Sequence, residues 1–418
     1  MFKKTKFAFV LALALGVASC TPKVGVLRSP SHQGTGNVTS NTTEKNESVN
    51  KTEETGSKLG KSKKIINQTI SLVLPFQLDQ IDPKLMNDKD IKRSALALDF
   101  YQGFQLGIDE LSQKGNDFNI NVLDSRDNAS FAASLALGDD VNTSSIIVGP
   151  IYPVEIKSFG AAFQNKNVIQ INPLAASMPT EFNIPNLVSI TPPIKAHTVA
   201  LGTKAAKDNI TGDKIIIYNT ADSDSKQFLN GMMTAIKQIK PNVSIVSVST
   251  LAQLNENLIS TGTNQIIAGT TDKTQLNNLI SNLSRKFSES SVSIKLYGHP
   301  LWDRFDFSTF SSFAYLNPTI TSESHLKTWT QNAKVFKDNY NKKFRVNPSD
   351  HSYKGYDAAI YFGSLLKKYG PEKMHDAIMK EPFTGIYSAY KFKHGDAWGY
   401  ANETVSYKIF RSGSFQLQ

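Results

Sequence analysis

The sequence predicts an α/β fold built from two doubly wound, parallel-sheet lobes. Short apolar segments alternate with amphipathic segments throughout the chain from Ile65 onward. The alternation runs once, then restarts near Lys195 as a second series of the same kind. Buried strands that alternate with helices are typical of parallel sheets covered on both faces. Two consecutive series therefore indicate two lobes.

The first series begins with a buried strand at Ile70–Phe76. A helix is predicted over Ser94–Lys114, because apolar residues recur there at steps of four and three, and Gly115 ends it. The elements that follow are the strand Phe118–Asp124, the helix Ala129–Leu137, the strand Ser145–Gly149, the helix Pro153–Asn165, and the strands Val168–Asn172 and Leu187–Thr191.

The second series has the same texture. Its predicted elements are the helix Thr198–Asn209, the strand Lys214–Asn219, the helix Lys226–Lys240, the strands Val243–Ser249 and Gln265–Gly269, the helix Gln275–Lys286 and the strand Ser293–Gly298. Beyond Ser312–Asn317 helices dominate, over Leu326–Lys343, Tyr353–Tyr369 and Pro371–Met379. The chain then alternates like antiparallel strands at Tyr387–Phe392 and Thr404–Phe410.

The N-terminal segment has the pattern of an export signal. Three lysines precede the apolar run Phe7–Val17, which forms about 16 Å of helix, well short of a membrane span of about 30 Å. Val17-Ala-Ser-Cys20 then resembles the lipobox of bacterial lipoproteins. That resemblance implies cleavage before Cys20 and diacylation of its sulfur; the alternative is an ordinary cleaved signal with an incidental cysteine.

Residues 21–64 are low in complexity and rich in Ser, Thr, Asn, Gly, Lys and Glu. Such a composition buries too little apolar surface to offset the entropy of ordering, so a disordered tether is expected. The glycosylation-type sequons at Asn37, Asn41, Asn46 and Asn50 follow from this composition.

The formal charge of +10 is concentrated outside the predicted lobes. Residues 1–20 carry +3 and residues 21–64 carry +4, which leaves +3 for the remainder. No basic stripe with interleaved aromatic residues occurs there, so the sequence argues against nucleic-acid binding.

The sequence contains none of the common catalytic or metal-binding motifs. The single cysteine precludes an intrachain disulfide, and the seven histidines are scattered without ligand spacing, so no metal and no cofactor are expected. No His-Glu-x-x-His, P-loop, Gly-x-Ser-x-Gly or Gly-x-Gly-x-x-Gly motif occurs. The sequence therefore predicts a protein that is not an enzyme.

Eight short features follow one another along the chain. They are Ile70–Phe76, Tyr101-Gln-Gly-Phe104, Ile147-Val-Gly-Pro150, Ile171–Ser177, Ile190-Thr-Pro-Pro193, Lys214–Tyr218, Leu296-Tyr-Gly298 and Gly355-Tyr-Asp-Ala358. Together they resemble the type I periplasmic binding proteins, as in branched-chain amino-acid-binding proteins. The resemblance implies lobes joined by a three-strand hinge. It divides the chain into a signal peptide (1–19), a lipidated cysteine and tether (20–64), lobe 1 (65–195 plus about 320–382) and lobe 2 (196–319 plus about 383–418).

The resemblance also implies a ligand held between the lobes, at loops that follow the carboxyl ends of strands. The corresponding positions are Tyr152, Ala175, Ser177, Ser223, Asp224, Trp302, Asp303 and Tyr356. Amino-acid-binding members often carry a small hydroxyl residue where Tyr152 stands, which puts an α-amino-acid ligand in doubt. The alternatives are a helix N-cap for Asp224, a core aromatic for Trp302 and helix packing for Tyr356, and packing is the stronger alternative for Tyr356.

Two functions follow as expectations. The first is a solute-binding lipoprotein that captures a small polar ligand, amino-acid-like or related, for an ABC importer or a sensor. The alternative is a non-enzymatic lipoprotein that regulates a partner in the cell envelope, such as a cell-wall synthase. In both, the membrane is contacted through the lipid alone, on the periplasmic face. Thr21, where an aspartate would favour retention in the inner membrane, favours the outer membrane.

Overall fold

The computed structural model describes residues 68–290 and 292–418. The segment Ile65–Gln418 forms one compact unit. The predicted signal peptide, the lipidation of Cys20 and the predicted tether lie outside the described residues.

The first lobe contains a seven-stranded sheet with the order β13-β14-β5-β4-β3-β1-β2. Its strands are β1 (Gln68–Leu74), β2 (Phe118–Asp124), β3 (Ile146–Val148), β4 (Gln170–Asn172), β5 (Leu187–Ser189), β13 (Phe392–Gly395) and β14 (Gly399–Asn402). All neighbouring strands run parallel except the β13–β14 hairpin. The predicted parallel architecture is confirmed.

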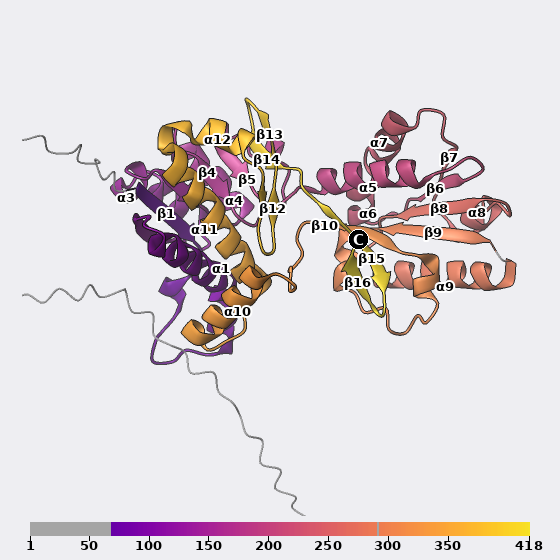
Figure 1. Ribbon diagram of the computed structural model, residues 1–418, viewed down its shortest axis with the longest axis horizontal. Coiled ribbons are helices and arrows are strands. Elements are labelled where there is room, and N and C mark those ends of the chain that lie inside the picture. The colour runs from indigo at the N-terminus through magenta and orange to yellow at the C-terminus, as the bar shows by residue number, and fades with distance from the viewer. Residues whose placement is uncertain (1–67, 291) are drawn as a thin grey trace, which may run out of the picture. The chain divides into compact units, whose positions relative to one another are not determined.

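Helices cover both faces of this sheet (Figure 1). One face carries α1 (Asp88–Gln113), α11 (Asp350–Tyr369) and α12 (Met374–Lys380), and the other carries α2 (Ala129–Leu135), α3 (Asp139–Asn142) and α4 (Pro153–Ala162). Helix α10 (Gln331–Phe344) packs beside α1 and α11. Helices α1 and α11 lie side by side because Gly103 and Gly355 have no side chain; a Cβ at Gly103 would meet the Ser352 carbonyl oxygen at 1.8 Å.

The second lobe contains a seven-stranded sheet with the order β16-β15-β10-β9-β8-β6-β7. Its strands are β6 (Lys214–Tyr218), β7 (Ile245–Val248), β8 (Thr263–Ala268), β9 (Ser293–Gly298), β10 (Thr319–Ser322), β15 (Ser406–Arg411) and β16 (Ser414–Leu417). Alternate side chains of its central strands enter two separate cores. One core packs against α5 (Ile194–Asp208), α6 (Ser223–Leu229) and α7 (Met232–Ile239), and the other against α8 (Leu251–Glu256) and α9 (Lys273–Ser290).

The chain passes between the two sheets three times. Residues 190–193 form the first crossover, from β5 to α5; residues 323–330 form the second, from β10 to α10; and residues 403–405 form the third, from β14 to β15. A two-stranded ribbon of β11 (Phe383–Thr384) and β12 (Ala389–Tyr390) lies between the second and third crossovers in the chain. The predicted three-strand hinge is therefore present.

The predictions that differ from the structure include one helix and one lobe boundary. The helix predicted over Lys226–Lys240 is divided into α6 and α7, because Gly231 adopts a φ of 80°, which is left-handed backbone that a helix cannot contain. The predicted second lobe included everything from about residue 383, whereas β13 and β14 complete the first sheet by pairing with β5. An antiparallel hairpin pattern predicts strands but does not say which sheet they join.

Candidate functional site

In the first lobe, three of the predicted ligand-binding residues lie on neighbouring loops. Tyr152 occupies the N-cap position of α4, in the loop that follows β3, while Ala175 and Ser177 follow β4, the neighbouring strand. The buried Asn172 side chain holds the latter loop, since its Oδ1 accepts from the Ala175 N–H at 2.9 Å and its Nδ2 donates to the Ala175 carbonyl oxygen at 2.9 Å. Burial raises the pKa of Tyr152, and Asp127 and Glu155 add to the shift, so this phenol stays neutral.

In the second lobe, Ser223 and Asp224 begin α6 after β6. The N-cap is Asp222 and not Asp224, because Asp222 Oδ1 accepts from the Ser225 N–H at 2.9 Å. Asp224 instead accepts a short hydrogen bond from the Thr271 hydroxyl, which follows β8. The carboxylate therefore links two neighbouring loops at the carboxyl edge of the sheet.

Trp302 is a core residue of the second lobe. Its side chain is 0% exposed, and its ring lies against Gly298, where a Cβ would meet the indole at 2.0 Å. The indole Nε1 donates to the Thr270 carbonyl oxygen at 2.8 Å. This placement contradicts the predicted ligand contact and agrees with the packing alternative, since a fully buried ring with a satisfied N–H offers no surface to a ligand.

Two further predicted ligand residues have internal partners. Asp303 pairs with Lys408, whose side chain is only 8% exposed, so this carboxylate neutralises a lysine of the same lobe. Tyr356 lies in the aromatic cluster between α10 and α11, and its hydroxyl donates to Glu110 Oε2 on α1 at 2.5 Å. The structure thus assigns Tyr356 to helix packing, against the predicted ligand role. The side chain of Asp303 remains 30% exposed to solvent.

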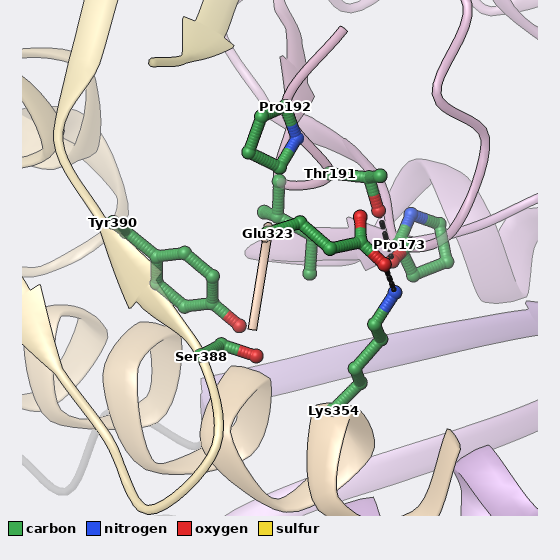
Figure 2. A pocket seen from close by; sticks show the side chains of 8 residues that line it. Pro173, Thr191, Pro192, Glu323, Lys354, Ser388 and Tyr390 are labelled. Carbon is green, nitrogen blue, oxygen red and sulfur yellow. Dashed lines mark hydrogen bonds and ion pairs between the residues drawn. The ribbon is translucent and has the colours of Figure 1, made fainter. Parts of the chain in front are cut away.

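A small pocket, here called the hinge pocket, lies between the first and second crossovers (Figure 2). It encloses about 10 Å³ and is lined by Pro173, Ile190, Thr191, Pro192, Glu323, Lys354, Ser388 and Tyr390. Glu323 Oε1 pairs with Lys354 Nζ at 2.7 Å across it. Burial alone would raise the pKa of Glu323, but the Lys354 ammonium outweighs that effect and lowers the pKa, so the pair is ionised.

A larger pocket, here called the flank pocket, is bounded by both lobes. It encloses about 310 Å³, within the size range of small-molecule sites. The first lobe contributes Met178, Pro179, Thr180, Lys393, Trp398 and Ala401, the third crossover contributes Glu403, and the first crossover and α5 contribute Pro193, Lys195, Ala196, Val199 and Ala200. Met178 directly follows the predicted ligand residue Ser177 in the chain. None of the eight predicted ligand residues lines either pocket.

Two buried histidines lie near the crossovers. His197 on α5 is 5% exposed, and its Nδ1 is 2.9 Å from the Thr321 hydroxyl on β10. His299 follows β9 at the N-cap of a short 3-10 helix, where its Nδ1 accepts from the Leu301 N–H at 3.1 Å. Burial lowers the pKa of each imidazole to about 4, so both are neutral at physiological pH.

Asp357 on α11 binds the turn at residues 386–388, which is hydrogen-bonded to the second crossover. Its carboxylate, 1% exposed, accepts from three consecutive backbone N–H groups, those of Ile386 at 3.0 Å, Tyr387 at 2.9 Å and Ser388 at 2.6 Å. The carbonyl oxygens of this turn then accept from the second crossover, at 2.9 Å from both His325 N and Lys327 N. Sequence reasoning placed this aspartate in a motif but missed its role, because its partners lie about thirty residues away.

Some side chains of the hinge were not predicted at all. Lys354 lies in a predicted helix, whereas Glu323 and His197 lie outside every predicted element, and none of the three was predicted to lie at the hinge. A single sequence holds no signal that would bring Glu323 and Lys354 together.

The described residues contain neither a metal-binding cluster nor a membrane-spanning helix. Over 68–290 and 292–418, no group of three or more His, Cys, Asp or Glu side chains is placed to hold a metal ion. Within those same ranges, no helix combines the length and apolar character needed to cross a bilayer.

Comparison with known proteins identifies the fold. A scan against protein-family models found no match, and a search of curated proteins found none. Among solved structures, a putative branched-chain amino-acid ABC transporter protein from Rhodospirillum rubrum is 14% identical over 84% of this chain and 100% of its own, with a TM-score of 0.64. An ABC transporter substrate-binding protein from Desulfitobacterium hafniense in complex with Leu is 15% identical over the same shares, with a TM-score of 0.52.

A third similar structure has a different role. The C-domain of LpoA from Haemophilus influenzae, described as a regulator of PBP1A, is 13% identical over 84% of this chain and 100% of that chain, with a TM-score of 0.53. All three combine low identity with full coverage of the other chain, which is evidence for the fold and not for a shared ligand. The segment Ile65–Gln418 has the two-lobed fold of the type I periplasmic binding proteins, as the resemblance in the sequence predicted.

Proposed function

We propose that this protein captures a small molecule between its lobes, in the flank pocket and the adjoining loops of the two sheets. The observation that carries the proposal is a pocket of about 310 Å³ to which both lobes and the first crossover contribute. A ligand bound there would contact both sides of the hinge, so its binding would favour one interlobe angle over others.

The lining indicates the chemistry of the ligand. Met178, Val199 and Trp398 give the flank pocket an apolar wall, while Lys195, Lys393 and Glu403 add two positive charges and one negative charge to its lining. An apolar body with a charged head group suits this combination. Leucine, which is bound in the similar structure from Desulfitobacterium hafniense, is a member of that class.

A ligand panel tests this function. Thermal unfolding of the full-length chain would be followed with branched and aromatic amino acids, aromatic carboxylates, short peptides and sugars. A ligand at 100 times its Kd adds about 2.7 kcal/mol of stability and raises Tm measurably. Absence of a shift from every member of the panel would contradict small-molecule capture.

A variant of the pocket tests the location. Val199 is 41% exposed on α5 and lines the flank pocket, so Val199→Trp fills the space that the ligand would occupy. We expect the Kd of any ligand found in the panel to rise at least about tenfold, equivalent to 1.4 kcal/mol. Lys207→Trp, an exposed position farther along α5 and outside the pocket lining, is the matched control and should bind as the unmodified chain does.

The second candidate function is regulation of a cell-envelope partner. It is favoured by the fate of the predicted ligand residues, because Trp302 and Tyr356 are buried and Asp303 is paired with Lys408. The LpoA C-domain shows that the fold is also used by a regulator of PBP1A. This function would be favoured over the first if the full-length chain binds a purified cell-wall synthase and no member of the ligand panel raises its Tm.

Attachment to the membrane is part of both candidates. We propose that Cys20 is lipidated and that the body lies on the periplasmic side, because the lipobox-like segment Val17–Cys20 follows a signal-type apolar run. Labelling of cells with a clickable palmitate analogue should mark the chain, and Cys20→Ser should abolish the label. Equal labelling of the variant would contradict lipidation at this residue.

A further inference from the structure

The hinge pocket has walls from the segments that connect the lobes. Ile190, Thr191 and Pro192 belong to the first crossover, and Glu323 begins the second. Ser388 and Tyr390 belong to the ribbon that receives the second crossover, and Lys354 comes from α11. Any change in the interlobe angle rotates backbone at the crossovers, so it would also move the walls of this pocket.

One group in this pocket is a buried donor that lacks a partner. Tyr390 is 2% exposed, and its hydroxyl oxygen has no partner of good hydrogen-bond geometry among the described residues; the Ser388 side chain beside it only opposes the rise in its pKa. Burial raises the pKa of this phenol, so it remains protonated. Figure 2 shows the hydroxyl directed into the pocket, beside the side chain of Ser388. A buried hydroxyl is rarely left unsatisfied in a native protein.

The same pocket supplies acceptors. The Glu323 carboxylate lines it and uses one oxygen, Oε1, for Lys354. The Thr191 hydroxyl is 3.5 Å from the Pro173 carbonyl oxygen, a long contact that leaves its lone pairs free to accept. Ser388 is 5% exposed and can donate or accept through its hydroxyl. The lining therefore offers both donors and acceptors around a single small space.

We propose that the hinge pocket is the binding site of one water molecule. Its volume of about 10 Å³ corresponds to about one water-sized sphere, and a buried water needs two to four polar partners. The water accepts from the Tyr390 hydroxyl and donates to the Glu323 carboxylate, and the Ser388 and Thr191 hydroxyls complete its shell. A single bound molecule thereby connects the first crossover, the second crossover and the ribbon.

Magnetic relaxation dispersion of oxygen-17 tests the proposal, because it counts internal waters that stay in a protein longer than bulk exchange allows. The full-length chain and Tyr390→Phe would be compared at equal concentration. The phenylalanine ring keeps the packing and removes the donor, so we expect the variant to hold about one long-lived water fewer. An unchanged count in a folded Tyr390→Phe would overturn the proposal.

Tyr361→Phe is the matched control. Tyr361 is also buried, at 4% exposure, but its hydroxyl donates to the Glu381 carbonyl oxygen at 2.9 Å and does not line the pocket. The control should keep the count of the unmodified chain. A crystal structure of the unmodified chain gives a reading that depends on no variant. Density for one solvent molecule within 3.2 Å of Tyr390 Oη supports the site, and a direct bond from Tyr390 to Ser388 with no density overturns it.

Discussion

The carboxylate of Asp357 accepts a hydrogen bond of 2.6 Å from the backbone N–H of Ser388, at the turn that leads into β12. The same oxygen accepts from Tyr387 N, and the other oxygen from Ile386 N. A turn that presents three consecutive N–H groups to one buried carboxylate is held more firmly than one bonded only to water. Through this carboxylate, helix α11 holds the turn at residues 386–388, whose carbonyl oxygens accept hydrogen bonds from the second crossover.

Replacement of this carboxylate should destabilise the protein. In Asp357→Asn one acceptor becomes a donor, which faces backbone N–H groups and leaves at least one of them buried without a partner. We expect the free energy of unfolding to fall by about 2–4 kcal/mol. Urea unfolding monitored by circular dichroism measures it. Asp338→Asn, at an exposed position of α10, is the control and should change stability by less than about 0.5 kcal/mol.

The buried His197 should make stability depend on pH. Burial lowers its folded pKa to about 4, against 6.5 for an exposed histidine, so the unfolded chain takes up the proton first as the pH falls. The stabilisation is complete above about pH 6.5 and is lost as the pH falls towards 4, by about 2 kcal/mol between pH 7 and pH 5. Urea unfolding at both pH values should show a smaller loss in His197→Gln. An imidazole resonance of His197 that titrates near pH 6.5 in the folded chain would contradict this.

The contact between Trp302 and Gly298 should tolerate no side chain. In Gly298→Ala the added Cβ would lie 2.0 Å from the indole, so the ring must move and its bond to the Thr270 carbonyl oxygen is lost. We expect a loss of about 1–3 kcal/mol and a red shift of tryptophan fluorescence. Gly138→Ala, where the added Cβ meets nothing closer than 3.3 Å, should show neither effect.

Asp303→Asn separates a structural role from a ligand role. The substitution leaves the Lys408 ammonium, which is 8% exposed, without its carboxylate partner. Because the Asp303 side chain is 30% exposed, solvent screens the pair, and we expect the free energy of unfolding to fall by only about 1–2 kcal/mol. Lys408→Met in the same chain should restore part of that stability. Ligand affinity should change less than about threefold if Asp303 serves only this pair. A tenfold loss of affinity with unchanged stability would return Asp303 to the binding site.

Much of the fold could be predicted from the sequence, because strand and helix leave periodic patterns that depend only on neighbouring residues. The strand Phe118–Asp124 and the strand Ser293–Gly298 have the predicted bounds. The sheet that receives β13 and β14 could not be predicted, since pairing with β5 joins residues about two hundred positions apart. Gly231 is a signal that was present and missed: a glycine inside a predicted helix can mark a break.

The candidate site was predicted less well, for a physical reason. Loop positions after strands could be located, but whether a side chain there faces solvent or the core depends on what packs beside it. The sequence could assign Trp302 to a loop and Tyr356 to a helix. Only the structure shows that the Trp302 ring is buried against Gly298 and that Tyr356 is buried against α10. Glu323 and Lys354 meet because a crossover and a helix meet, which no local pattern encodes.

The return of β13 and β14 to the first sheet has a consequence for biosynthesis. The first sheet contains both Gln68 in β1 and Asn402 in β14, so it cannot close until all the residues between them have left the ribosome. The second lobe likewise waits for β15 and β16. A chain cut between Ser189 and Gly399 would lack the partner strand of β5 and would leave the edge of β5 open to pairing with other strands.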